Sequence, residues 1–313
     1  MSTLDQARSA PLPVGRERGE RVARTKKRGG WRREVRETWW RHLVGILAVL
    51  FSMFPLVYIA SAAFNAVPSL SGAQVIPDRL TLHNFGILFH DESTHYFRWY
   101  ANTMIIASCT AVITVLLGAL AAYAFSRFRF KGRRMGLLGL LLVQMFPQLL
   151  LIVAIYLIVL QVGKVFGFIG LNTLTGLILV YLAGAMSVNV WLLKGFFDTI
   201  PSELDESARV DGATPAQVFW GVILPLAAPV LAVIGLFSFI GVVNEFVIAS
   251  VLLQNSEKFT LALGLRSFID QQYAEHWGPF AAGVLLAAPP VVILFLFLQR
   301  FIVSGLTGGA VKG

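Results

Sequence analysis

The sequence is poor in charge and almost free of cysteine. Only 14% of its 313 residues are charged, against about a quarter in an ordinary soluble protein. The single cysteine, Cys109, excludes a disulfide within the chain. The sequence also holds no G-x-x-x-x-G-K-[ST] phosphate-binding loop, no H-E-x-x-H motif and no plausible catalytic triad. These absences argue against a soluble domain, a disulfide-stapled domain and an enzyme that hydrolyses ATP by itself.

Long apolar runs take the place of charge. Hydrophobic residues make up 56% of the chain, and six runs reach the roughly 20 residues that a transmembrane helix needs. None shows the alternation of a membrane β-barrel strand. The sequence therefore predicts an all-α membrane protein with a six-helix transmembrane domain over residues 43–303. The expected spans are 43–65, 101–125, 135–161, 173–195, 224–253 and 279–302.

Positive charge is concentrated at the N-terminus. Residues 1–42 carry 12 Lys and Arg against 5 acidic residues. Beside a span, such a cluster is typical of the cytoplasmic side and of contact with anionic lipid, rather than of nucleic acid. We expect disorder up to about residue 30 and an interfacial helix over 31–41. A basic region of 42 residues is too long for the start of a signal peptide.

The connecting loops predict the topology. Segments on the same side as the N-terminus hold about 20 Lys and Arg, and the other loops hold about 5. The positive-inside rule places both termini in the cytoplasm. Of the outer loops, 66–100 reads as solvated, because the spacing of its three histidines (seven and five residues) matches no compact metal motif. No metal site is predicted.

The polar segment 201–225, between the fourth and fifth spans, reads as two short helices joined by a turn. Ser202 is expected to cap the first helix, with Glu206 at its end. Gly212 supplies the break, because glycine reaches positive φ without a Cβ penalty. Thr214-Pro-Ala-Gln217 has the form of a capping box with proline at the first helical position. The second helix should present one apolar face, made of Ala216, Phe219, Trp220 and Ile223. Composition alone does not decide whether that face is buried in the lipid headgroup layer or in a groove on another protein.

The same segment carries a specific spacing. Glu206, Ala208, Gly212, a hydrophobic residue at 222 and Leu224-Pro225 resemble the EAA loop of ABC-importer permeases, although Ser207 stands where that family usually has Ala. The stretches 144–147, 168–172, 204–225 and 299–313 resemble the MalG-type permease subunit of maltose/maltodextrin importers. The resemblance covers nearly everything after about residue 100, and the long basic tail is its main departure.

The resemblance implies a non-enzymatic permease subunit of a bacterial plasma (inner) membrane importer. Its coupling helix would dock on an ATPase, and the tail 304–313 would reach the ATPase dimer interface. The implied contact residues are Glu206, Ser207, Ala208, Asp211, Gly212, Ala213, Phe219, Leu224 and Pro225 in the loop, and Gly308, Gly309 and Lys312 in the tail.

The resemblance also implies partners and a substrate. The partners are a second, MalF-like permease subunit, a MalK-like ATPase dimer, an extracytoplasmic sugar-binding protein and membrane lipid. This chain would bind no cofactor, since ATP and Mg would be held by the ATPase. The implied substrate is maltose or maltodextrin, or a related α-glucoside such as trehalose.

Polar residues inside the spans are candidates for a transport pathway. They are Gln144, Asn244 and Glu245, with Gln148 and Asn189 as further ones. Glu245 is expected near the outer end of the fifth span, where a carboxylate either faces a pathway or is simply hydrated. The alternative function, a stand-alone secondary transporter or channel, needs titratable residues within the membrane, and only Glu245 qualifies.

Overall fold

The computed structural model describes residues 31–66, 77, 79–91, 94–269 and 276–310. The described chain divides into two units, one ending at Met53 and one beginning at Phe54. The first unit is the N-terminal part of helix α1 (Trp31–Phe64), so the expected interfacial helix and the first span form one continuous helix. The expected disorder up to about residue 30 lies outside the described residues.

The second unit is helical throughout its described part, where no strand is found and one isolated bridge joins Asn65 to Leu80. This confirms the predicted all-α class. Besides the end of α1, the helices are α2 (His83–His90), α3 (Tyr96–Arg127), α4 (Arg133–Met145), α5 (Gln148–Val165), α6 (Leu174–Phe197), α7 (Glu203–Val210), α8 (Pro215–Val218), α9 (Leu224–Leu226), α10 (Ala228–Asn244), α11 (Val247–Leu252), α12 (Leu261–Arg266) and α13 (Trp277–Ala310).

Four continuous helices are long and apolar enough to cross a membrane: Thr38–Phe64, Tyr96–Arg127, Leu174–Phe197 and Trp277–Phe301. Two bent helix pairs raise the number of spans among the described residues to as many as six. The expected third span is broken beside Pro147, where α4 and the next helix meet at 110°. A proline at that point removes a backbone donor and favours such a break.

The expected fifth span, 224–253, is also interrupted. The segment Pro215–Leu226 meets α10 at 77°, and a second break at Glu245 separates α10 from α11. The expected second span starts five residues early, at Tyr96, because Tyr96 and Trp99 in its first turn are buried against other helices. The loop 66–100 is therefore not solvated throughout, since it also contains α2.

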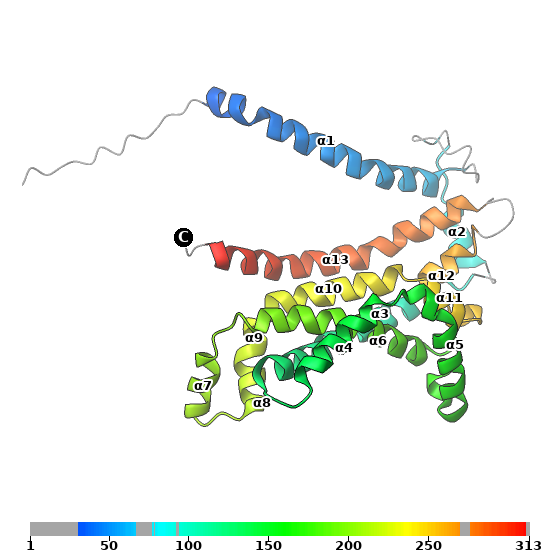
Figure 1. The fold of residues 1–313 in the computed structure, drawn as a ribbon. Coiled ribbons are helices and arrows are strands. Elements are labelled where there is room, and N and C mark those ends of the chain that lie inside the picture. Colours follow the sequence, from blue (N-terminus) through cyan, green and yellow to red (C-terminus); the bar gives the residue numbers. More distant parts are fainter. Residues whose placement is uncertain (1–30, 67–76, 78, 92–93, 270–275, 311–313) are drawn as a thin grey trace, which may run out of the picture. The chain divides into compact units, whose positions relative to one another are not determined.

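Helix α3 is central to the second unit and packs on α6 and α10. Its buried face includes Thr103, Thr110 and Thr114, which recur at intervals of seven and four residues and so lie on one side of the helix. Figure 1 shows α7 and α8 beside one end of this bundle and α12 near the opposite end. The two ends carry separate clusters of buried side chains.

Candidate functional site

The loop between α6 and α10 has the helix–turn–helix form that the sequence predicts. Gly212 lies at φ +86°, which confirms the left-handed turn. The Thr214 hydroxyl accepts from the backbone N–H of Gln217, and the Gln217 side chain accepts from the backbone N–H of Thr214 at 2.7 Å. This reciprocal pair confirms the capping box, with Pro215 at the start of α8. The backbone N–H of Ala213 closes the turn by donating to the Ala208 carbonyl at 2.9 Å.

Two expectations for the first helix are wrong. Ser202 occupies the N-cap position of α7 with helical backbone angles, and its side chain makes no capping hydrogen bond. Glu206 lies in the first turn of α7 and not at its end, because the helix continues to Val210. An acid in the first turn interacts favourably with the helix dipole, so the position of Glu206 costs the helix nothing.

A buried ion pair attaches the loop to the bundle. Arg127, the last residue of α3, places its Nε 2.6 Å from Oδ2 of Asp205 in α7, and the two side chains are only 11% and 5% exposed. The same guanidinium donates to the Ile200 carbonyl at 2.8 Å. One cation therefore holds both the entry to the loop and its first helix against the end of α3. The sequence did not predict this pair, although the basic turn after α3 and the acidic residues of α7 are both evident in the sequence.

A second polar contact lies beside the first. Asp198, just past the end of α6, accepts hydrogen bonds from Ser126 at 2.7 Å and from Lys194. Burial by itself would raise the pKa of the Asp198 carboxyl, but the hydrogen bonds from Lys194 and Ser126 outweigh it and lower that pKa. Asp198 is more exposed than Asp205, so this contact stabilises the loop less.

The apolar face expected on the second helix is not formed as one surface. Phe219 and Ile223 are buried inside the chain, and the Phe219 ring lies 5.0 Å from the ring of Tyr123 in α3. Ala216 and Trp220 are exposed instead. Residues 219–223 form a π-helical turn, which adds a residue to the turn and shifts the side chains away from the α-helical spacing assumed from the sequence. The buried Phe219 therefore anchors the loop to its own bundle.

The remaining loop candidates differ in exposure. Glu206, Ser207, Asp211 and Gly212 are exposed, and Pro225 is exposed within α9. Ala208, Ala213 and Leu224 are half-buried and pack on the cluster around Phe219. Two apolar side chains not singled out by the motif, Leu204 and Val210, are exposed at 40% and 87%. The loop thus presents a mixed acidic and apolar outer surface.

The polar candidates within the bundle do not form one site. Glu245 accepts a hydrogen bond from the Tyr181 hydroxyl at 2.5 Å and others from the backbone N–H groups of Ile248 and Ala249. It therefore joins α6 to the start of α11 across the helix break. Asn244 donates to Ile240 of its own helix. Gln144 lies by contrast beside a largely apolar pocket of about 490 Å³ lined from α4, α5 and α6.

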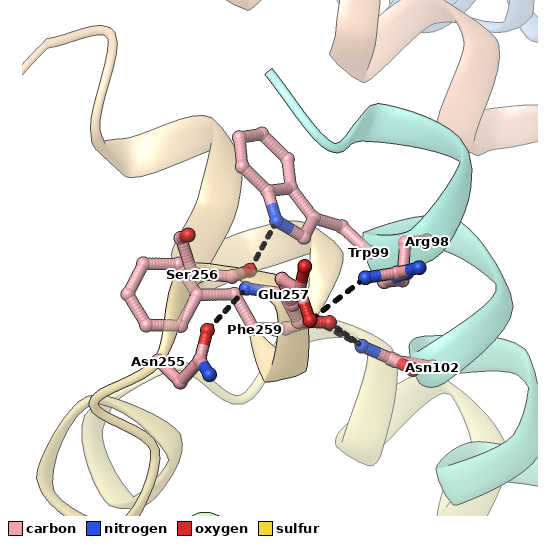
Figure 2. Close-up of polar contacts among 7 residues, drawn as sticks. All are labelled: Arg98, Trp99, Asn102, Asn255, Ser256, Glu257 and Phe259. Atoms are coloured by element: carbon pink, nitrogen blue, oxygen red, sulfur yellow. Dashed lines mark hydrogen bonds and ion pairs between the residues drawn. The ribbon is translucent and has the colours of Figure 1, made fainter. Parts of the chain in front are cut away.

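At the opposite end, the first two turns of α3 hold the segment after α11 (Figure 2). The Trp99 indole N–H donates to the Ser256 carbonyl at 2.7 Å, and the Asn102 amide donates to the Glu257 carbonyl at 3.0 Å. Arg98 forms an ion pair of 2.9 Å with the Glu257 side chain. These contacts fix the start of the segment 254–278, which leads into α13. Its residues 270–275 lie outside the described part.

Two of the three tail candidates lie within α13. Gly308 and Gly309 belong to the backbone of α13, and Lys312 lies outside the described residues. Within the described ranges, no group of three or more His, Cys, Asp or Glu side chains is arranged to hold a metal ion.

Membrane-spanning helices joined by an anchored helix–turn–helix loop with the EAA spacing define a transport permease of the ABC-importer type. The family described as "Binding-protein-dependent transport system inner membrane component" matches residues 114–307. The chain belongs to this family and is a multi-pass inner-membrane protein.

Relatives along almost the whole chain are sugar permeases. The galactooligosaccharides transport system permease protein GanQ of Bacillus subtilis (strain 168) is 39% identical over 283 residues, covering 90% of this chain and 98% of GanQ. The maltodextrin permease protein MdxG of the same strain is 39% identical over 261 residues, covering 83% of this chain and 91% of MdxG. The maltose/maltodextrin permease protein MalG of Vibrio vulnificus (strain YJ016) is 39% identical over 287 residues, covering 88% and 96%.

A solved structure supports the same fold. It is the crystal structure of a bacterial ABC transporter involved in the import of the acidic polysaccharide alginate. One of its chains matches with a TM-score of 0.68 and 25% identity, covering 87% of this chain and 98% of that chain.

Proposed function

We propose that this chain is one of two dissimilar permease subunits of an ATP-driven importer of maltose, maltodextrin or a related α-glucoside such as trehalose. The near full-length similarity to maltodextrin and maltose permeases supports this substrate class. GanQ is equally similar in sequence, so galactose-containing oligosaccharides belong among the sugars to be tested. A MalF-like permease, a MalK-like ATPase dimer and an extracytoplasmic sugar-binding protein complete the transporter.

The observation that carries this proposal is the form of the loop 201–225. Its helices are tied to the bundle by Arg127 and Phe219, while Val210, at 87%, and Trp220, at 52%, stay exposed. Exposed apolar side chains on short helices are suited to a groove on a protein partner. In the proposed complex they enter a cleft of the ATPase. The ATPase subunits hold ATP and Mg. Closure of the ATPase dimer moves this loop and turns the pore outward.

The acidic surface of the loop gives a direct test of docking. Glu206→Lys reverses the charge at the EAA position and is expected to reduce co-purification of the ATPase with tagged permease and to stop ATP-driven uptake. Glu203→Lys is the matched control, because Glu203 is also exposed in the first turn of α7 but lies outside the EAA spacing. If Glu206→Lys bound the ATPase and supported uptake as well as Glu203→Lys and the parent chain do, the loop would not belong to the ATPase interface.

The topology completes the proposal, with both termini and the loop 201–225 in the cytoplasm. The asymmetry of Lys and Arg supports this orientation. In a Cys109→Ala background, a single cysteine at Asn255 is expected to react with an impermeant reagent in right-side-out vesicles, and one at Ser202 is not. The reverse pattern would refute the orientation.

The full function is tested in proteoliposomes containing both permeases and the ATPases, with the binding protein outside and ATP inside. Labelled maltose, maltotriose, trehalose and a galactooligosaccharide are compared. ATP-dependent uptake of an α-glucoside is the expected result. Uptake by the permeases alone, driven by an ion gradient and independent of ATP, would instead establish the stand-alone secondary transporter.

A further inference from the structure

A basic pocket lies at the same end of the bundle as the loop 201–225, the proposed coupling loop. The pocket is lined from the turn after α3, the first turn of α4 and the end of α6. Its volume is about 490 Å³. Three cationic side chains line it: Arg133, Arg134 and Lys194. Apolar side chains line it too, including Phe130 and Met135. The pocket shares no residue with the coupling loop or with the polar contacts of Glu245.

The charge in and around this pocket is only partly neutralised inside the chain. Lys194 is paired with Asp198, and Arg133 is near enough to help lower the pKa of that carboxyl. Among the described residues, the Arg134 side chain makes no hydrogen bond or ion pair, and the side chains of Arg129 and Lys131 in the adjacent turn make none either. Among the described residues, the pocket and the adjacent turn thus hold five cationic side chains, of which only Lys194 forms an ion pair, with Asp198. This excess of positive charge favours an anionic ligand.

The apolar part of the pocket restricts the kind of anion. Met135 is 72% exposed and Phe130 is 46% exposed, although both are large and hydrophobic. They lie where α4 begins, and the following residues of α4 are largely apolar and exposed at Leu138, Leu141 and Leu142. In an inner-membrane protein, such a surface is suited to contact with lipid chains. A ligand that fills this pocket thus needs a negative head and a hydrocarbon tail.

We propose that the pocket binds the phosphate of an anionic phospholipid, with Arg133 and Arg134 holding the headgroup and Phe130 and Met135 contacting the glycerol and the upper acyl chains. Basic pockets at the cytoplasmic ends of transmembrane helices are suited to such headgroups. The proposal rests on the membrane location of the chain and on the proposed cytoplasmic orientation of this end, and it is independent of the transported sugar.

The test is native mass spectrometry of the full chain in detergent, titrated separately with phosphatidylglycerol, phosphatidylcholine and inorganic phosphate. Phosphatidylglycerol is expected to bind in preference to phosphatidylcholine, and excess phosphate is expected to compete weakly. The double variant R133Q/R134Q should weaken phosphatidylglycerol binding about 30-fold, at roughly a fivefold loss per basic residue. The matched control R129Q/K131Q removes the same charge from the adjacent turn without changing the pocket lining, and should weaken binding by less than about threefold.

A further variant guards against misfolding. Met135→Glu introduces an acid at an exposed lining position while leaving both arginines in place, and should also reduce phosphatidylglycerol binding. Each variant is first compared with the parent chain by its unfolding midpoint. Equal loss of binding in R133Q/R134Q and R129Q/K131Q would overturn the proposal in favour of diffuse attraction. Equal affinity for phosphatidylcholine, or full displacement by phosphate, would overturn it as well.

Discussion

The ion pair between Arg127 and Asp205 is expected to determine whether the coupling loop stays attached to the bundle. The two charges lie 2.6 Å apart in a nearly dry site. At an effective dielectric constant of about 20, their attraction is about 6 kcal/mol, and the desolvation of both charges offsets much of it. Asp205→Ala leaves the guanidinium buried with the Ile200 carbonyl as its remaining partner. Removing one member of a buried pair costs about 3–5 kcal/mol.

That cost falls on the local attachment of the loop and can be read by limited proteolysis. Arg209, exposed in α7, becomes a trypsin site when the loop detaches. A loss of about 3–5 kcal/mol raises the detached fraction by about two to four orders of magnitude, until detachment is complete. Asp205→Ala should therefore speed cleavage after Arg209 strongly. The double variant Arg127→Met with Asp205→Leu should cleave nearly as slowly as the parent, because an apolar pair replaces the ionic one without leaving a buried charge.

The control is Asp198→Asn, which weakens a more exposed contact beside the same loop and should change cleavage by less than about fivefold. If Asp205→Ala cleaved no faster than this control, the ion pair would not hold the loop. A double variant as labile as Asp205→Ala would show that the cost lies in packing, and the electrostatic reasoning would fail.

Three further predictions concern other parts of the chain. Gly212→Val should introduce about 1–3 kcal/mol of backbone strain, because the position has a left-handed conformation, and should release the ATPase in a pull-down. Gly221 is the control, because it also has open space around it but lacks the positive φ of Gly212. Gly221→Ala should therefore retain the ATPase. Tyr181→Phe removes the hydroxyl partner of Glu245 and should lower the unfolding free energy by about 1–3 kcal/mol, measured by denaturant titration; an unchanged value would contradict a buried role for that bond. Deleting residues 304–313 should leave membrane insertion intact and weaken the ATPase response to sugar, and an unchanged response would separate the tail from coupling.

Local sequence chemistry predicted much of the coupling loop. The capping box at Thr214 and the positive φ of Gly212 depend on residues within four positions of one another, so their geometry follows from the local sequence. The break beside Pro147 also has a local cause, because proline acts on its own helix, although Pro55, Pro289 and Pro290 lie inside continuous helices. The helical spans followed from the length and apolarity of the runs.

Features that depend on distant partners were not visible. Asp205 is 78 positions from Arg127, and the turn after α3 offers several other cations, so the sequence gives no reason to choose this pair. The break at Glu245 contains neither proline nor glycine. It is stabilised by a carboxylate that accepts two backbone N–H groups of α11 and the Tyr181 hydroxyl from α6. A hydropathy pattern registers none of these bonds.

The failure of the predicted apolar face changes how the loop must act. A helix with Phe219 and Ile223 on its docking surface would be held mainly by its partner. Because both side chains are buried in the chain's own core, and Arg127 secures the preceding helix, the loop is attached to the bundle on both sides of the Gly212 turn. We therefore expect a displacement of its outer surface, at Val210 or Trp220, to be passed to α3 through packed side chains instead of being absorbed by a flexible connector. Such an attachment is what ATP-driven movement of the pore requires of the proposed coupling element.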